Sequence, residues 1–156
     1  SGCYNSPTIS EKEVIMSCCS KREVVTCSNA PAAIGPYSVA IATGCLIFVS
    51  GQLGIDPKSG KIVEGGIQAQ TRTALTNLKS VLESAGSGLE NVVKTTVFLT
   101  DMAQFAEMNA IYAEFFTSDH PARSAIQVAA LPKGGIVEIE AIAVLQRQHA
   151  GECACE

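Results

Sequence analysis

The run "IVEIEAIAVL" at residues 136–145 constrains the fold most, because its apolar residues alternate with two glutamates. A period of two is typical of a β-strand whose two faces meet different surroundings. One face is wholly apolar and is expected to pack against helices: Val137, Ile139, Ala141, Ala143 and Leu145. The opposite face mixes carboxylates with apolar side chains: Ile136, Glu138, Glu140, Ile142 and Val144. Buried charges are costly unless they are paired or do chemistry, so this mixed face predicts cover by another subunit, with the charges lining a cleft.

Strands and helices alternate along the central part of the chain. Two segments rich in β-branched and aromatic residues, at 45–50 and 91–100, predict strands. Between them, apolar side chains recur every three or four positions over 67–85, which predicts an amphipathic helix that ends at Gly86. The segment "DPKSGK" at 56–61 carries the proline and glycine of a turn.

A second helix is expected after Asp101, whose carboxylate can cap the first turn. Its core side would carry large apolar side chains: Phe105, Met108, Tyr112, Phe115 and Phe116. Two more strands follow at about 124–130 and 136–145, with Arg123 just ahead of the first, and a short strand is expected at 23–27. This order predicts one α+β domain with two helices packed on one face of a mixed sheet.

The charge of the chain argues against a broad nucleic-acid surface. Its 156 residues suit one domain with a real core, and its net charge is -4. Phosphate binding needs clustered lysine and arginine, so RNA is a disfavoured partner. No segment approaches the roughly 18 apolar residues of a membrane span, so no membrane partner is expected.

The seven cysteines do not form a framework of paired spacings. All except Cys45 lie near the two ends of the chain. An odd count without a signal-peptide pattern predicts a reduced, cytoplasmic protein. Cys153 and Cys155 with His149 could bind a metal ion, but a solvent-exposed tail is the preferred interpretation without a second spaced pair. No metal site is therefore predicted, and Met16 is an alternative start of the chain.

Four segments together resemble one family: "SNAPAAIGPYSVA" (28–40), "VSGQLGIDPKSGKIV" (49–63), "NVVKTTVFLTDMAQFAEMNAIYAEFF" (91–116) and "PARSAIQVAALPKGGIVEIEAIAV" (121–144). They are similar to the RidA/YjgF family of reactive enamine/imine deaminases, whose members are also described as L-PSP endoribonucleases or translation inhibitors. The similarity covers about residues 25–146, which defines the predicted domain. Residues 1–24 are then an N-terminal extension, and residues 147–156 are a cysteine-bearing C-terminal tail.

The resemblance implies a chorismate-mutase-like α+β fold that assembles as a homotrimer with clefts between subunits. It implies hydrolysis of 2-aminoacrylate, 2-iminobutyrate and related imines to 2-keto acids and ammonia. The expected partners are therefore small imino and keto acids, and no cofactor is needed.

The same resemblance assigns roles to two charged residues. Arg123 in "PARS" matches the carboxylate-binding arginine of the family, and a planar guanidinium suits a carboxylate. Glu138 matches the glutamate that positions water for attack on the imine carbon. Glu140 shares its strand face and could support this network, although an interfacial ion pair is the preferred interpretation.

Four further positions match the substrate-binding pocket of the family. Tyr37 would be a hydrogen-bond donor or wall, and its alternative role is that of a core aromatic. Ser50 and Gly51 end a strand near the ligand, or form a simple turn there. Asn109 would contact the ligand or its neighbours, or make a structural hydrogen bond.

Two positions depart from patterns common in the family. Ala125 stands where some members have a reactive cysteine, so hydrolysis must proceed through water. His120 stands in a short connection where many members have a bulky aromatic, which could alter the pocket rim. A solvated loop histidine is preferred over a catalytic one.

Two other functions stay open from the sequence. An endoribonuclease or translation inhibitor would want a phosphate-binding patch with aromatics, or a histidine acid–base pair. A non-catalytic binder of small carboxylates would need only Arg123, whereas the presence of Glu138 favours turnover.

Overall fold

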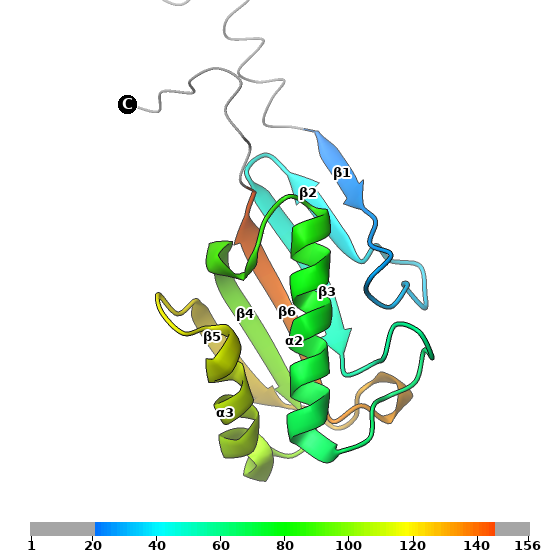
Figure 1. Cartoon of the computed structure of the whole chain (residues 1–156), viewed down its shortest axis with the longest axis vertical. Coiled ribbons are helices and arrows are strands. Elements are labelled where there is room, and N and C mark those ends of the chain that lie inside the picture. The colour runs from blue at the N-terminus through cyan, green and yellow to red at the C-terminus, as the bar shows by residue number, and fades with distance from the viewer. Residues whose placement is uncertain (1–20, 146–156) are drawn as a thin grey trace, which may run out of the picture.

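The computed structural model describes residues 21–145 (Figure 1). Within them, one sheet has the strand order β1-β2-β3-β6-β4-β5. The strands are β1 Arg22–Val25, β2 Ala40–Thr43, β3 Leu46–Leu53, β4 Val92–Leu99, β5 Ala122–Gln127 and β6 Val137–Val144. The helices α2 (Gly66–Ser84) and α3 (Phe105–Phe115) cover one face of this sheet (Figure 1). The described residues also include the 3-10 turns η1 Leu89–Asn91, η2 Met102–Gln104 and η3 Pro132–Gly134. The predicted α+β class, with two helices on one face of a mixed sheet, is confirmed.

The sheet is antiparallel except between β4 and β5, which run parallel. A parallel pair needs a long crossover, and α3 supplies it. β6 lies in the middle of the sheet between β3 and β4, and β5 is an edge strand. The last strand of the described chain therefore carries its side chains at the centre of both faces.

The core lies between the sheet and the helices. The α2 residues Leu75, Leu78, Val81 and Leu82 are fully buried, as the predicted amphipathic pattern requires. They meet the apolar face of β6, on which Val137, Ile139, Ala141 and Ala143 are buried. The predicted division of this strand into an apolar face and a mixed face is confirmed.

The first predicted helix also ends where expected. Gly86 has a φ of 79°, a left-handed conformation that glycine adopts without a steric penalty. The Ser87 N–H donates to the Leu82 carbonyl at 2.9 Å, and the Gly86 N–H donates to the Glu83 carbonyl at 3.0 Å. These two bonds satisfy carbonyls that the helix leaves free at its end.

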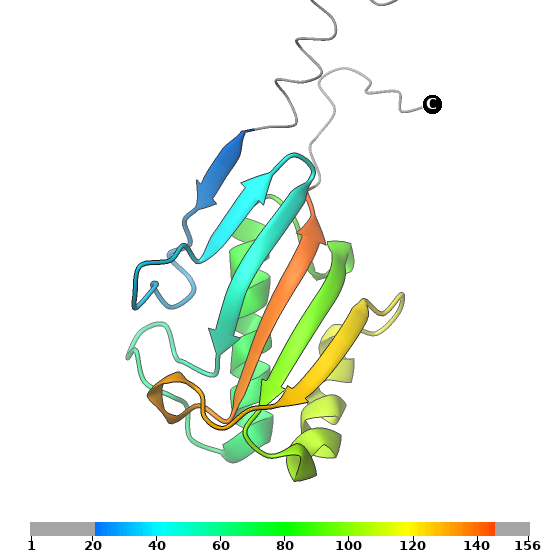
Figure 2. The same cartoon turned by 180° about the vertical axis from the view of Figure 1, so that it is seen from behind.

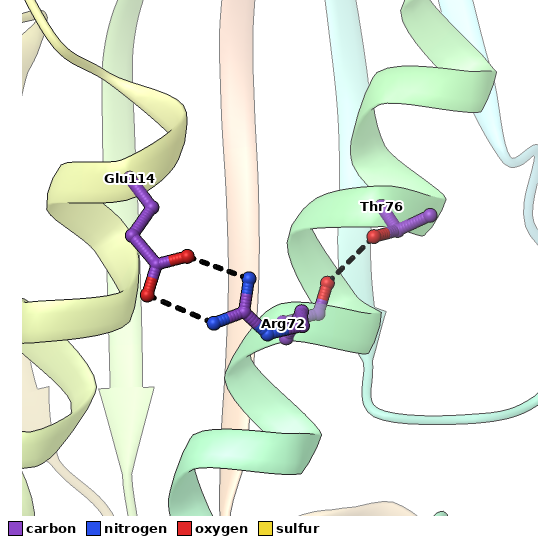
Figure 3. Close-up of polar contacts among 3 residues, drawn as sticks. All are labelled: Arg72, Thr76 and Glu114. Atoms are coloured by element: carbon purple, nitrogen blue, oxygen red, sulfur yellow. Dashed lines mark hydrogen bonds and ion pairs between the residues drawn. The ribbon is translucent and has the colours of Figure 1, made fainter.

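The two helices are joined on their outer side by charged residues. The Arg72 guanidinium on α2 donates to both carboxylate oxygens of Glu114 on α3, at 2.7 and 2.8 Å (Figure 3). Gln68 donates to Glu107 at 3.1 Å one turn away. α3 is thus attached to α2 both by core packing and by this polar layer.

Several predicted boundaries were wrong. β2 was missed because its four residues carry no strong alternation of their own, and its pairing with β3 decides the conformation. β5 begins at Ala122 rather than at 124, so Arg123 lies inside the strand, and it ends at Gln127 rather than at 130. Its limits follow its parallel partner, because Ala122 to Gln127 align with Lys94 to Leu99. Asp101 caps η2 through a bond from the Ala103 N–H, and η2 leads into α3.

The face of the sheet opposite the helices, here called the open face, is seen in Figure 2. Apolar side chains remain exposed on it, including Phe48 at 42% and Val144 at 38%. A shallow hollow of about 500 Å³ lies on this face. It is lined by residues of β2, β3, β4 and β6: Ile41, Phe48, Val49, Ser50, Lys94, Thr96, Glu140, Ala141 and Ile142.

No helix between residues 21 and 145 is both long and apolar enough to cross a membrane.

Candidate functional site

Arg123 lies on the helix side of the sheet, near the edge formed by β5. In the parallel pairing it aligns with Thr95, a fully buried residue of β4, and so faces α3. Its guanidinium carbon lies 4.6 Å from the ring centroid of Tyr112 and 5.6 Å from that of Phe105. Both distances are within the range of a cation–π contact. The arginine is therefore held against two aromatic rings of α3.

The polar groups of this arginine have no protein partner in the described chain. Among residues 21–145, the Arg123 guanidinium makes neither a hydrogen bond nor an ion pair. By contrast, the Arg72 guanidinium on α2 donates two hydrogen bonds to the carboxylate of Glu114. Arg123 is half-buried and its N–H donors are unmatched among residues 21–145, so the guanidinium can accept an anion such as a carboxylate as its partner.

The Tyr112 side chain is held in position by a second buried residue, Thr95. Its hydroxyl lies 2.7 Å from the hydroxyl of Thr95, and its ring stacks on Phe116 with centroids 4.6 Å apart. Burial raises the pKa of Tyr112, while the Thr95 hydrogen bond and the positive charge of Arg123 act in the opposite direction. The tyrosine therefore remains a neutral ring beneath the guanidinium.

Glu138 lies on the open face of the sheet. It aligns with Phe98 in β4, whereas the neighbouring helix-facing positions are the buried Val137 and Ile139. The side chain is half-buried, and this burial raises the pKa of its carboxyl, with the nearby charge of Glu140 adding to the effect. Glu138 can therefore hold or release a proton at a higher pH than an ordinary glutamate.

Ser50 and Gly51 lie beside Glu138 at an irregularity in β3. The register between β3 and β6 shifts between Val49 and Gln52, as in a β-bulge. The Ser50 hydroxyl donates to the Ser38 carbonyl at 2.7 Å, which ties the bulge to the preceding loop. A β-carbon on Gly51 would collide with the Glu138 side chain, so glycine is required for this close approach.

Two further predicted residues lie outside these two groups. Tyr37 is 49% exposed on the loop before β2, and its hydroxyl accepts a bond from the Ile34 N–H at 3.3 Å. The alternative role as a core aromatic is therefore wrong for Tyr37. Asn109 is half-buried on α3, four residues after Phe105 and three before Tyr112, so helical spacing places it on their side. No described residue hydrogen-bonds to its amide.

The remaining predicted positions are distributed around these groups. Glu140 is exposed on the open face, and its interfacial ion pair stays a prediction. Ala125 is half-buried and shares the helix-facing side of β5 with Arg123. His120 is exposed in the loop before β5. His149, Cys153 and Cys155 lie outside the described residues, and residues 21–145 contain no group of three side chains arranged to hold a metal ion.

The structure thus separates the candidate residues into two groups on opposite faces of one sheet. Ser50, Gly51 and Glu138 lie on the open face, whereas Arg123 lies on the helix face. The rings of Phe105 and Tyr112 beneath Arg123 were not predicted to belong to the site, because both residues were assigned to the core of the second helix. Their spacing of seven residues places them on one helix side, but nothing in it points to an arginine on a later strand.

The chain matches the family described as Endoribonuclease L-PSP over residues 27–145. It is 53% identical over 123 residues to the 2-iminobutanoate/2-iminopropanoate deaminase of Bos taurus, which covers 79% of this chain and 90% of the bovine protein. Among solved structures, RidA from the Antarctic bacterium Psychrobacter is similar with a TM-score of 0.77 and 44% identity, covering 79% of this chain and 99% of that one. TdcF of E. coli, solved with bound serine, has a TM-score of 0.75 and 41% identity, covering 78% and 98%.

Proposed function

The chain belongs to the family described as Endoribonuclease L-PSP, which includes the RidA proteins, and from this premise we propose that it hydrolyses 2-imino acids to 2-keto acids and ammonia. The bovine relative at 53% identity is named for deamination of 2-iminobutanoate and 2-iminopropanoate, and those compounds are the substrates proposed here. The reaction needs no cofactor, and a cytoplasmic location is part of the proposal.

One observation carries this proposal: Arg123 is half-buried, rests on aromatic rings and has no anionic partner among residues 21–145. A 2-imino acid brings the missing anion as its carboxylate, which a guanidinium can bind through two parallel hydrogen bonds. The structural relative TdcF, solved with serine, holds a ligand with the same carboxylate group.

Glu138 supplies the second requirement, which is control of a water molecule and its protons. In the reaction, water adds to the imine carbon, and one of its protons passes to the nitrogen. The hydroxyl of the resulting carbinolamine then gives its proton to the nitrogen as the carbonyl forms. The carbon–nitrogen bond breaks, its electron pair leaves with ammonia, and the keto acid remains. A carboxyl with a raised pKa is suited to accept the proton from water and return it to nitrogen.

The opposite orientations of Arg123 and Glu138 support a site built between subunits. In the proposed homotrimer, one subunit contributes Arg123 with Asn109, and its neighbour contributes Glu138 with Ser50, Gly51 and Tyr37. The exposed apolar side chains of the open face favour cover by another copy of the chain. Closure of the cleft would exclude water other than the reacting one.

A coupled assay tests this function directly. A dehydratase generates 2-aminoacrylate or 2-iminobutyrate, and loss of the imine signal is followed with the wild type, Arg123→Ala and Glu138→Gln. We expect the wild type to accelerate imine hydrolysis. Each variant should lower that rate by about 100-fold or more, because this is the scale of removing a positioned acid–base or binding group. The control Arg22→Ala removes an exposed arginine of β1 and is expected to retain full activity.

Failure of the folded wild type to accelerate imine loss would reject the deaminase and leave the two alternatives. RNA cleavage is then measured directly, because the family description also refers to endoribonuclease activity. Of the residues at 21–145, His120 is the only histidine, and it is exposed and far from a second one in the sequence. Binding of a keto acid without turnover would instead support the non-catalytic binder.

A further inference from the structure

We infer that Tyr112, held in place by Thr95, is a positioning residue for Arg123. The inference rests on the proposed function and deepens it, since it explains how the Arg123 guanidinium is held in a geometry that can bind the substrate carboxylate. The rings of Phe105 and Tyr112, here called the aromatic shelf, are the contacts that hold the guanidinium. Neither residue touches the reacting atoms in this account, and both act through Arg123.

The need for such a shelf follows from the arginine side chain. A free arginine loses the conformational entropy of a long side chain when it is held in one geometry. Arginines usually recover this through hydrogen bonds to a carboxylate, as Arg72 does with Glu114. A fixed carboxylate beside Arg123 would compete with the substrate, whereas an aromatic ring orients the cation and leaves its N–H groups free to donate.

The shelf is itself fixed by a strand of the sheet. The Tyr112 hydroxyl and the Thr95 hydroxyl are 2.7 Å apart, and both residues are buried, at 5% and 0% exposure. Thr95 is also the β4 residue that aligns with Arg123 of β5. Thr95 therefore anchors the Tyr112 ring through its hydroxyl. The register of β4 and β5 places the backbone of Arg123 beside the same threonine.

Besides filling volume, Tyr112 offers a ring face to Arg123 and a hydroxyl to Thr95. A leucine would fill much of the space without a ring face, and a phenylalanine would keep the face without the bond to Thr95. Double-mutant cycles separate these roles from general stability, because a positioning residue loses its effect when Arg123 is absent.

The experiment uses Tyr112→Leu, Tyr112→Phe and Thr95→Val, each with Arg123 present and with Arg123→Ala. The readouts are kcat and KM for 2-iminobutyrate and the dissociation constant of its product, 2-oxobutyrate. We expect Tyr112→Leu to raise KM and the dissociation constant about tenfold, the size of a partly desolvated cation–π contact, with kcat within about twofold. Tyr112→Phe and Thr95→Val are expected to raise both by about two- to threefold, which is the scale of one lost neutral hydrogen bond.

With Arg123→Ala, the same three changes are expected to have no further effect. Equal fold-changes in both backgrounds would overturn the inference, because Tyr112 would then act only through packing. The control Phe115→Leu removes a half-buried ring of α3 for which no contact with Arg123 is found, and it is expected to leave KM unchanged. If Tyr112→Leu does not fold, the two milder variants carry the same comparison.

The outcomes distinguish the inference from the function on which it rests. A wild type that turns over imine but shows additive effects would reject the positioning role alone. A wild type that binds 2-oxobutyrate without turnover would reject the deaminase and still test the shelf by binding. A wild type that neither turns over imine nor binds the keto acid would reject both.

Discussion

The Glu138 side chain lies in the space that a β-carbon on Gly51 would occupy. The two residues come from neighbouring strands, β6 and β3, and meet at the bulge after Val49. The absence of a side chain at residue 51 therefore allows the carboxyl to lie close to the backbone of β3. A substitution at residue 51 therefore tests whether hydrolysis depends on the position of the Glu138 carboxyl.

Gly51→Ala is expected to displace the Glu138 carboxyl and lower kcat/KM for 2-iminobutyrate by about 10- to 100-fold, as a misplacement near 1 Å can do. Because the colliding atoms belong to the flexible, half-buried Glu138 side chain, which can move aside, the free energy of unfolding should change little. The imine assay and urea denaturation measure the two effects. The matched control is Gly88→Ala, in which the added carbon meets the carboxylate of the exposed Glu90 on η1. Equal losses of activity in both variants would contradict a specific role for the Gly51 contact.

The raised pKa of Glu138 predicts a pH-dependent cost to folding. Between the ordinary glutamate pKa of 4.5 and its raised value, the folded chain binds more protons than the unfolded chain. The stability due to this group is therefore complete below 4.5 and is lost as the pH rises through the raised pKa. Glu138→Gln should then be more stable than the wild type at pH 7 and gain little at pH 4.

Urea denaturation at fixed protein concentration and at both pH values measures this difference. Glu64→Gln serves as the control, because Glu64 is exposed outside the helices and strands, and its substitution should change the free energy of unfolding by less than about 0.5 kcal/mol. A gain for Glu138→Gln that is as large at pH 4 as at pH 7 would show that burial of charge is not its cause.

The exposed apolar side chains of the open face predict that a charge there prevents assembly. Phe48 is 42% exposed and lines the shallow hollow beside Ile142. Phe48→Asp is expected to convert the proposed trimer to a folded monomer and to abolish imine hydrolysis, because Arg123 and Glu138 could then not share a cleft. Light scattering after size exclusion measures the mass, and Phe48→Leu should remain a trimer. A fully active Phe48→Asp monomer would contradict the inter-subunit site.

The ion pair between Arg72 and Glu114 is expected to contribute little to stability despite its geometry (Figure 3). The two side chains are 49% and 50% exposed, so water and salt screen the attraction, and a double-mutant cycle should give about 0.2–1 kcal/mol. The cycle uses Arg72→Gln and Glu114→Gln, measured by urea denaturation at low and high salt. The single 3.8 Å contact between Lys79 and Glu83 within α2 provides the comparison and should couple less. A coupling above about 2 kcal/mol that persists in high salt would contradict this account.

Local patterns in the sequence were enough to predict those parts of the fold that each segment determines alone. The alternation of β6, the apolar face of α2 and the glycine at its end are all confirmed, since each depends on spacing within one segment. Strand β2 was missed and β5 was shifted, because their limits come from partner strands elsewhere in the chain. The sequence of one segment does not specify its register with the strand beside it.

The same difference applies to the candidate site. The residue types and motif matches in the sequence predicted Arg123 as a carboxylate-binding group and Glu138 as a water-positioning group, and both roles stay predictions. The tertiary structure decided that they face opposite sides of the sheet, that Gly51 makes room for the glutamate, and that Tyr112 and Phe105 lie beneath the arginine. These relationships join residues from different strands and helices, and they arise from strand register and helix packing, which become defined only when the whole chain has folded.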